Sequence, residues 1–447
     1  MKHISSVTAA ALLAMLAASN LAAQATSTGT VRTDIPVVDA PFNFAEGIRG
    51  PSMAQSLAVT NGFYEVAHPA ISSLFGSHTR LGGTAIFFFD LFGSVIPPGD
   101  AWVHEEYHRA VLSHRGVSSF DDTYHFDLTA ETINVSHVLD ADLIRMKAEH
   151  PVDYVRAAAA GIEGENLMIE GLEKNRFFQD SRAKNVALYW LTKINSAGYV
   201  WSGITLSTDT LVDDANREEG ADVAKRDWIG HDFTGWVHDL FRPTEPYTAR
   251  GVHPSGVGIN RYIRASDLSP EEHDFLNREG ELQLINFIDP NLFGFTGFSV
   301  QNPLTGRDAR MMVTGSAYLT SFGHSVDMNL FLRDDAMNLF VVLHRYTNGA
   351  RSFPGVEAQL LDKPVTIAGM NVAVSPRVAL WLQPQDQQFR TATKQPGGLV
   401  SLRVRQASAA RVTSFLEVEA KTEGWVAGNV HLEPNVSVRI GGSVRAN

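Results

Sequence analysis

The polarity pattern of this chain changes period once, after about Met311. Before that point apolar residues recur at helical spacing, as Val103, Tyr107 and Val111 do on one helix face. After it, apolar and polar residues alternate, as in 326–333, which is typical of half-buried strands in antiparallel hairpins. We therefore expect an α+β fold: a mainly helical N-terminal domain, followed by a C-terminal antiparallel β-sheet or β-barrel region over residues 301–447.

The alternating segments, roughly eight to ten of them, allow two interpretations. One is an outer-membrane barrel, with apolar side chains toward lipid and polar ones toward the lumen. The other is a soluble antiparallel sheet with one wet face. Strand lengths near ten residues and charged side chains at the polar positions favour the first. The ending Arg445-Ala446-Asn447, in place of an aromatic strand end, and the lack of clear aromatic girdles favour the second. Both interpretations stay open.

The first 25 residues predict an export signal. Lys2 and His3 precede an apolar run, Val7–Ala18, that is too short to span a bilayer as a helix. Ala23-Gln24-Ala25 follows as a small-residue cleavage pattern. We expect a signal peptide over 1–25 that is cleaved after export, a helical domain over 26–300, and a mature protein in the periplasm or the outer membrane. The apolar run Leu81–Ile96 carries Asp90 at its centre, which favours a buried helix over a membrane span.

The charge balance argues against nucleic acid as a partner. The 447 residues include 37 Lys and Arg against 49 Asp and Glu, a formal net charge of −12. There is no surplus of cations to displace counterions from a phosphate backbone. Cysteine is absent, which excludes disulfides, thiolate metal ligands and a cysteine nucleophile. A metal site in this chain must be built from His, Asp or Glu.

One short segment carries recognisable chemistry, the H-E-x-x-H motif of His104-Glu105-Glu106-Tyr107-His108. Residues four apart lie on the same helix face, so the imidazoles of His104 and His108 can reach one Zn²⁺ at about 2.0–2.1 Å. Glu105 would project beside the metal, where it can take a proton from bound water. The alternative is a surface helix on which these histidines merely sit among charges.

A catalytic zinc site needs a third protein ligand, with the fourth position left for water. His114 stands ten residues after His104, where the pattern H-E-x-x-H-x-x-G-x-x-H places its third histidine. Val111 occupies the glycine position of that pattern, and a β-branched residue resists the left-handed conformation that would turn the chain there. His114 is one of three candidates.

The other candidates lie in the segment 160–166, within a long helix expected from 152 to 178. With the H-E-x-x-H helix, this segment resembles the gluzincin class of zinc metallopeptidases, in which a Glu on a second helix completes the site. The resemblance covers these two helices only. Glu106 and Arg109 depart from the family pattern, which usually has an uncharged and an apolar residue at those places. The resemblance implies zinc and a peptide or protein substrate, with His104 and His108 as ligands, Glu105 as catalytic base, and Glu165 or Glu163 as third ligand.

Of the two acidic candidates, Glu165 is favoured over Glu163. Glu165 shares a helix face with Gly161 and Ile162, the apolar, closely packed side. A carboxylate on a packed face is costly unless a cation neutralises it. Glu163 shares a more polar face with Arg156 and is the second choice.

The sequence thus favours an exported zinc peptidase in which Glu105 activates water. A tetrahedral oxyanion would need a further donor, and carboxylates are expected to orient the imidazoles. The competing function is an outer-membrane or periplasmic barrel or binding protein without catalytic activity, in which the motif is incidental. The donor candidates are His231, His238, Arg261 and Tyr262, and the orienting candidates are Asp100, Asp121 and Asp122.

Overall fold

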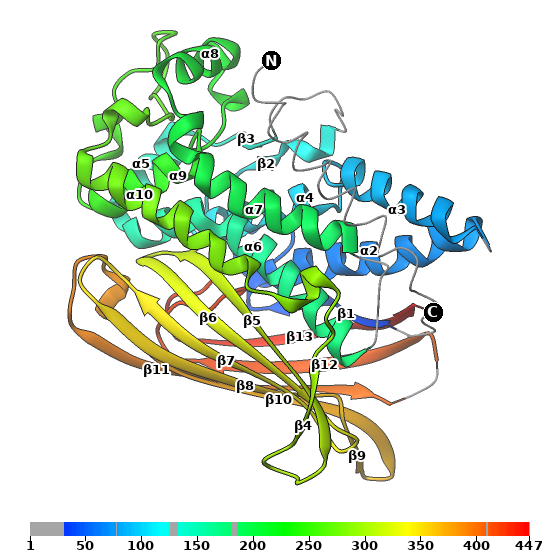
Figure 1. Ribbon diagram of the computed structural model, residues 1–447. Helices are drawn as coiled ribbons and strands as arrows, with labels where there is room; N and C mark the ends of the chain where they lie inside the picture. Colours follow the sequence, from blue (N-terminus) through cyan, green and yellow to red (C-terminus); the bar gives the residue numbers. More distant parts are fainter. Residues whose placement is uncertain (1–30, 77, 126–132, 180–185, 408–409, 447) are drawn as a thin grey trace.

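A layer of helices covers one face of a large antiparallel sheet, as the computed structural model in Figure 1 shows. The structure describes residues 31–76, 78–125, 133–179, 186–407 and 410–446. Helices dominate up to residue 300 and strands dominate after it, so the expected α+β fold is confirmed. The signal peptide expected over residues 1–25 lies outside the described residues.

The helices pack on one side of the sheet, where long α6 contacts β5, and α4 and α9 pack against α6. α10 begins as its sequence predicts, because the Ser269 side chain accepts a hydrogen bond from the Glu272 amide and Pro270 takes the first turn. The helices are α2 (Met53–Leu74), α3 (Thr79–Gly93), α4 (Asp100–His114), α5 (Asp140–Glu149), α6 (Pro151–Phe178), α7 (Val186–Leu206), α8 (Asp209–Glu219), α9 (Asp232–Phe241) and α10 (Pro270–Leu282).

The main sheet has 11 strands in the order β1-β13-β12-β11-β10-β8-β7-β6-β5-β4, with β9 paired to β10. Neighbours are antiparallel, as hairpin connections dictate. A separate two-stranded ribbon pairs β2 (Phe120–Asp121) with β3 (Val135–Ser136). The remaining strands are β1 (Val31–Ala40), β4 (Phe298–Gln301), β5 (Asp308–Thr320), β6 (Gly323–Arg333), β7 (Asn338–Thr347), β8 (Ser352–Leu361), β9 (Lys363–Ile367), β10 (Met370–Pro384), β11 (Lys394–Gln406), β12 (Val412–Lys421) and β13 (Asn435–Ala446).

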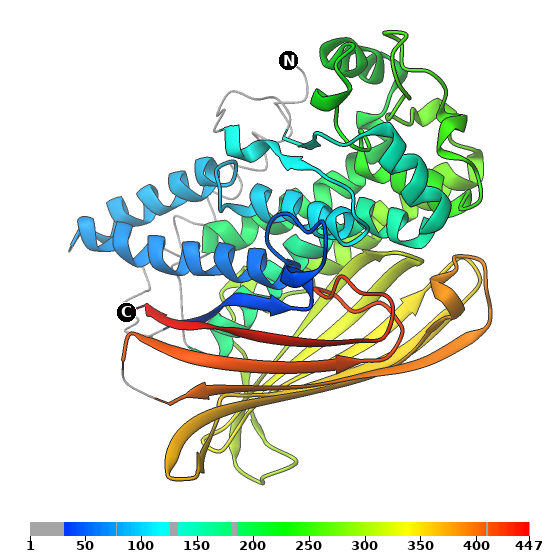
Figure 2. The same cartoon turned by 180° about the vertical axis from the view of Figure 1, so that it is seen from behind.

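The strand β1 joins the two ends of the described chain. It pairs antiparallel with β13, with Thr33 opposite Val444 and Ala40 opposite Val438 (Figure 2). Arg439 on β13 reaches across to Asp39, with its Nε 3.2 Å from a carboxylate oxygen. The N-terminal part of the chain therefore supplies one edge strand of the main sheet.

Small residues on α6 let α4 approach closely. A Cβ added to Gly164 would lie 2.9 Å from the Tyr107 ring, and one added to Gly161 would lie 2.2 Å from the His104 ring. Both helices are buried over most of their length, in one core with α7 and α9. The stripe of small residues on α6 thus determines the distance between α6 and the motif helix α4.

The helix α3 corresponds to the apolar run 81–96. Its Asp90 is buried and bonds His68 of α2 at 2.5 Å, but Phe88 and Phe92 are exposed. The expected helix is present, whereas only one side of it is buried. In the described part of the chain, no helix is both long enough and apolar enough to cross a membrane.

Candidate metal centre

The motif helix α4 is a core helix. Every residue from Trp102 to Ser113 is buried, so the surface-helix interpretation is wrong. Its two departures from the gluzincin pattern neutralise each other, because Arg109 donates a hydrogen bond to Glu106 within the same helix. Tyr124 donates a second hydrogen bond to Glu106 at 3.1 Å. A buried charge pair with such partners is tolerated, and it leaves the opposite helix face to the histidines.

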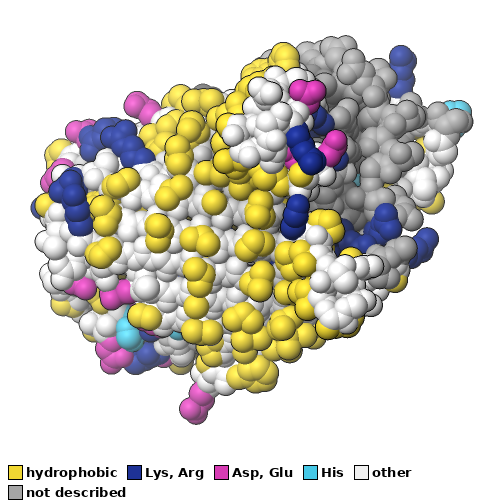
Figure 3. Space-filling model, turned by 90° about the horizontal axis from the view of Figure 1, so that it is seen from below, with side chains coloured by type: hydrophobic (Ala, Val, Ile, Leu, Met, Phe, Trp, Pro, Cys, Tyr) yellow, Lys and Arg dark blue, Asp and Glu magenta, His cyan; other side chains and the backbone are white. Residues whose placement is uncertain are grey.

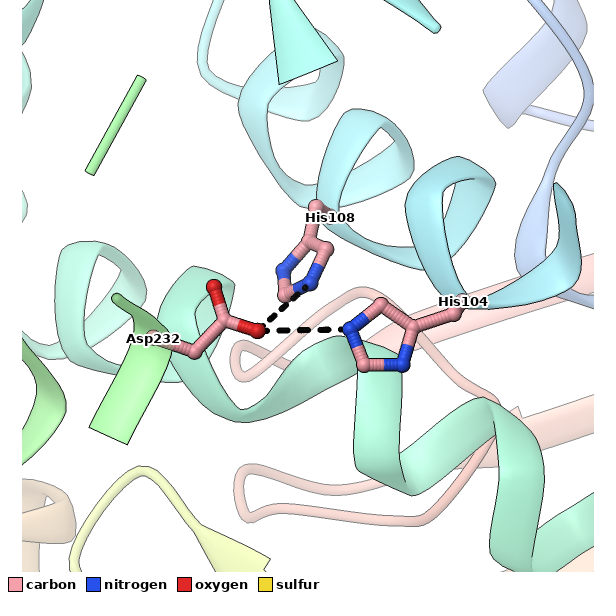
Figure 4. A group of neighbouring side chains, drawn as sticks. All are labelled: His104, His108 and Asp232. Atoms are coloured by element: carbon pink, nitrogen blue, oxygen red, sulfur yellow. Dashed lines mark hydrogen bonds and ion pairs between the residues drawn. The ribbon is translucent and has the colours of Figure 1, made fainter. Parts of the chain in front are cut away.

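His104, His108 and Asp232 converge on one point (Figure 4). Asp232 Oδ2 lies 3.3 Å from His104 Nε2 and 3.5 Å from His108 Nε2. The two imidazole centroids are 4.8 Å apart. All three side chains are buried, with exposed fractions of 6% for His104, 1% for His108 and 6% for Asp232. This group could hold a metal ion.

Two of the donor-atom separations fit tetrahedral coordination of a small metal ion. Two ligands about 2.1 Å from a zinc ion, at a tetrahedral angle, lie about 3.4 Å apart. The measured 3.3 and 3.5 Å separations agree with that value. Two imidazoles and one carboxylate are also ligands that zinc accepts, with a fourth position left for water. The residues present therefore fit such an ion.

The opposite nitrogens of both rings are held by acceptors. His108 Nδ1 donates to the backbone carbonyl of Ala157 at 2.6 Å, and His104 Nδ1 donates to Glu165 Oε1 at 2.9 Å. With each Nδ1 donating outward, each Nε2 faces Asp232, where it donates to the carboxylate when protonated or offers its lone pair to a metal ion. Such outer hydrogen bonds fix ring orientation at metal sites and raise the basicity of the ligand.

The imidazoles and carboxylates of the site shift one another's pKa values. Burial alone would lower the pKa of His104, but hydrogen bonds to Asp232 and Glu165 outweigh it and raise this pKa well above its ordinary value. Burial likewise opposes ionisation of Asp232, yet the two imidazoles hold the pKa of its carboxyl well below its usual range. The negative charge of the Asp232 carboxylate is thus paired with positive charge at the two imidazoles.

Glu105 lies beside this group with its carboxylate buried. Burial raises the pKa of its carboxyl well above the ordinary value; the nearby His104 opposes this, while Asp121 and Asp232 reinforce it. No hydrogen bond to the Glu105 carboxylate is found within the described ranges. The side chain is 8% exposed. A carboxylate that is nearly dry and free of donors can accept a proton at neutral pH.

Glu165 and Glu163, the acidic candidates, take different positions. Glu165 contacts His104, but at Nδ1, on the ring side away from Asp232. Glu163 bonds Arg156 at 3.0 Å and accepts hydrogen bonds from the Trp425 indole at 3.2 Å and the Gly428 amide at 2.7 Å. The geometry gives Glu165 an orienting position, and it ties Glu163 to the loop between β12 and β13.

His114, the remaining candidate, lies at the end of α4, away from the centre. Its Nε2 lies 3.1 Å from Glu433 Oε1, and its ring stacks edge-on against His431 with centroids 4.5 Å apart. Arg115 also bonds Glu433, at 3.1 Å. His114 therefore belongs to a separate cluster of side chains.

The carboxylate Asp232 was not among the residues expected from sequence. It is the first residue of α9, directly after Gly230 and His231, and Gly230 has φ +77°. A Cβ on Gly230 would lie 2.6 Å from the Tyr262 ring, so this turn favours glycine. The local signal, an acidic residue that opens a short helix after glycine, marks a helix start but says nothing about a metal.

The residues expected to stabilise an oxyanion all have partners elsewhere. His231 bonds Ser207 at 3.0 Å, and Tyr262 donates to Glu219 at 3.1 Å. His238 lies against Asp239, and Arg261 donates to Asp140 and to the Val138 carbonyl.

The expected orienting carboxylates contact neither imidazole. Asp121 accepts hydrogen bonds from Thr123, Asp122 accepts one from Ser136, and Asp100 accepts one from the Ala101 amide. The orienting positions are filled by Glu165 and by the carbonyl of Ala157.

A cavity of about 850 Å³ lies between the helices and the sheet, away from the metal centre. Its lining combines tyrosines and tryptophans with paired charges, such as Glu357 with Arg377 at 2.7 Å and Glu417 with Arg439 at 2.8 Å. None of the three metal-site side chains lines it, nor does Glu105. Tyr107 of α4 lines the cavity, so the motif helix borders it, but its metal-site side chains do not.

Comparisons of the chain with models of protein families, with curated proteins and with solved structures found no match.

Proposed function

We propose that the protein is a zinc-dependent hydrolase that cleaves peptide bonds. One observation carries the proposal: His104 and His108 point their Nε2 atoms at one carboxylate oxygen of Asp232, at tetrahedral spacing, with Glu105 beside them. This is the ligand set and the neighbouring base that water activation requires. The likeness of the motif helix to zinc metallopeptidases supports peptide or protein as the substrate.

Zinc at this centre would lower the pKa of a bound water and polarise the substrate carbonyl. Glu105 accepts the proton of the attacking water and passes it to the leaving amine. His104 and His108 hold their orientation through Glu165 and the Ala157 carbonyl, which keeps both Nε2 atoms directed inward. The buried setting strengthens these interactions because it excludes bulk water.

The test compares metal content and hydrolysis in the full chain. We expect about one zinc per chain by elemental analysis, and cleavage of a quenched fluorescent protein substrate such as labelled casein. Glu105→Gln should keep the zinc and lose the cleavage by at least about 100-fold, because general-base catalysis contributes on that order. Glu271→Gln is the control, since Glu271 is exposed and distant from α4. Full cleavage by Glu105→Gln would overturn the mechanism.

A second candidate function is a binding protein without catalytic activity. The observation that favours it is the cavity of about 850 Å³, which neither Glu105 nor any of the three metal-site side chains lines. Under this proposal the helical layer is a scaffold and carefully purified protein contains no stoichiometric zinc. The metal analysis above therefore separates the two functions.

A further inference from the structure

The two faces of the main sheet differ in chemistry, because ion-paired and aromatic side chains face the helices and aliphatic side chains face outward. On β12 the residues that face the helices include Glu417, Glu419 and Lys421, and all three are buried. The alternate residues Leu416 and Val418 face outward and are 44% and 42% exposed. An antiparallel sheet with one wet face normally buries its apolar side and exposes its polar side. This sheet departs from that rule, because its outer face is aliphatic and its inner face holds ion pairs beside aromatic residues such as Phe340 and Trp381.

The outward apolar residues form a continuous band across the strands. Strand register places Val341 opposite Leu330 and Ala358, and Val378 opposite Ala358 and Val400. The complete row crosses seven neighbouring strands and consists of Leu330, Val341, Ala358, Val378, Val400, Ala420 and Val436. At about 4.8 Å per strand, this row is about 29 Å long.

The band is also deep along each strand. On β10 the outward residues run from Val374 through Val378 and Leu380 to Leu382, a rise of about 26 Å at about 3.3 Å per residue. The band measures about 29 by 26 Å. Its area is larger than the apolar patch of a few hundred Å² that a typical monomer exposes. Its depth approaches the hydrocarbon thickness of a bilayer, about 25–30 Å.

Charged side chains lie at the margins of this band. Figure 3 shows the outer face as apolar and uncharged over its centre, with Lys, Arg, Asp and Glu toward its edges. Arg345 and Lys394 lie near one end of the strands, and Lys363 and Arg411 lie near the other. Long cationic side chains at both margins can reach a polar interface while the centre stays apolar.

The shape of the face favours a fluid occupant over a second protein molecule. The sheet curves around the helical layer, so its outer face is convex (Figures 1 and 2). Two convex faces of identical copies would touch along a narrow strip, which falls short of the roughly 800 Å² per partner of a stable interface. Lipid acyl chains conform to a convex wall. We propose that the outer face of this sheet contacts the hydrocarbon region of a lipid bilayer, with the helical layer on the side away from the lipid.

The absence of cysteine from the chain allows a direct test with single labels. Val378→Cys places one thiol at the centre of the band, and Val252→Cys places one at a residue that is 72% exposed before α10. The full-length variants carry a bimane label and are reconstituted in vesicles of phosphatidylethanolamine with some phosphatidylglycerol. A lipid with a nitroxide on its acyl chain should quench the label at residue 378 and leave that at residue 252 bright. Equal, weak quenching at both would overturn the proposal.

A charge substitution provides an independent measure. An arginine at the midplane of a lipid-facing strand is destabilising. Val378→Arg should therefore lower the partition constant of the protein between vesicles and buffer, measured by flotation, by about 30-fold or more. Val252→Arg should leave it unchanged. Circular dichroism checks that both variants are folded. Three results would overturn the proposal. Folded Val378→Arg could float as the wild type does, or salt or carbonate alone could release the wild type from vesicles. The label at residue 378 could also report self-association in place of lipid contact. Zinc content does not enter either measurement, so the outcome is independent of the proposed hydrolase.

Discussion

Glu165 Oε1 lies 2.9 Å from Nδ1 of His104, while the Nε2 atom of the same ring faces Asp232. The imidazole is thus held between two carboxylates, one on each nitrogen. Only the nitrogen nearer Asp232 is directed at the point where His108 also converges. The two acids thus contact different nitrogens of one ring, and in the proposed zinc site Glu165 would orient that ring while Asp232 would complete the ligand set.

Replacing Glu165 should weaken zinc binding without removing it. Glu165→Ala deletes the acceptor that orients His104, and outer-shell losses of this kind lower metal affinity about 10- to 100-fold. Glu165→Gln keeps an acceptor oxygen but not the charge, so its loss should be smaller. Competition with a chromophoric chelator measures both affinities. The control is Glu170→Gln on the same helix, where the side chain pairs with Lys174. Zinc loss as complete as that of His108→Ala would make Glu165 a direct ligand.

A single methyl group at Gly161 should abolish the metal centre. An added Cβ would lie 2.2 Å from His104 Nε2, far inside contact distance, so Gly161→Ala must push the ring away from Asp232. The matched control is Gly198→Ala in α7, where an added Cβ meets nothing within 4 Å. That change should be neutral or stabilising by roughly 0.5–1 kcal/mol, because alanine is the better helix former. Zinc content and thermal unfolding of the two variants provide the comparison. Stoichiometric zinc in folded Gly161→Ala would show that the ring does not occupy this position.

The local half of this centre could be predicted from sequence, and the distant half could not. His104, Glu105 and His108 lie within one turn and a half of helix, so spacing alone places them together. Asp232 joins them from 128 residues away through the packing of α9 on α6. No periodicity encodes that contact, which depends on how helices cross.

The same distinction applies to the fold. Alternation along β6 and β7 predicts both strands, and a short turn dictates that they pair. The pairing of β1 with β13 joins residues about 400 positions apart, such as Asp39 and Arg439. Alternation also left open which face of the sheet meets the helices. The ion pairs of Arg377 with Glu357 and Arg439 with Glu417 turn the charged side inward, and only the assembled structure shows that they are satisfied there.

Stability should fall as pH rises toward neutrality, because of Asp100. Burial, reinforced by Glu165, raises the pKa of the Asp100 carboxyl to about 7 from 3.8. Below about pH 4 it is protonated in both the folded and the unfolded chain, and the shift has no effect. Between about pH 4 and 7 only the unfolded chain loses the proton, which favours unfolding by up to about 4 kcal/mol at 1.36 kcal/mol per pKa unit.

Asp100→Asn should remove that pH-dependent loss. Urea unfolding at about pH 4.5 and about pH 8, with a chelator present throughout, measures the free energy of unfolding of both proteins. The variant should gain stability over the wild type at the higher pH and little at the lower. Asp213→Asn is the control, since Asp213 is about half exposed. The burial of an uncompensated carboxyl would be contradicted if the free energy of unfolding changed equally with pH in the wild type and in Asp100→Asn.

Zinc should stabilise the folded chain only while Asp232 is present. A ligand that binds the folded state alone adds about 2.7 kcal/mol to the free energy of unfolding when its free concentration is 100 times Kd. Removing the carboxylate leaves two imidazoles on one helix, so Asp232→Ala should unfold at the same denaturant concentration in zinc and in chelator. The matched control is Asp209→Ala, because Asp209 is also the acidic first residue of a helix, α8, and is exposed. Both changes remove the same favourable charge from a helix N-terminus, worth roughly 0.3–1 kcal/mol, and only the first removes a ligand. A zinc-dependent gain that survives in Asp232→Ala would place the ion elsewhere, with the cluster of His114, His431 and Glu433 as the alternative within the described residues.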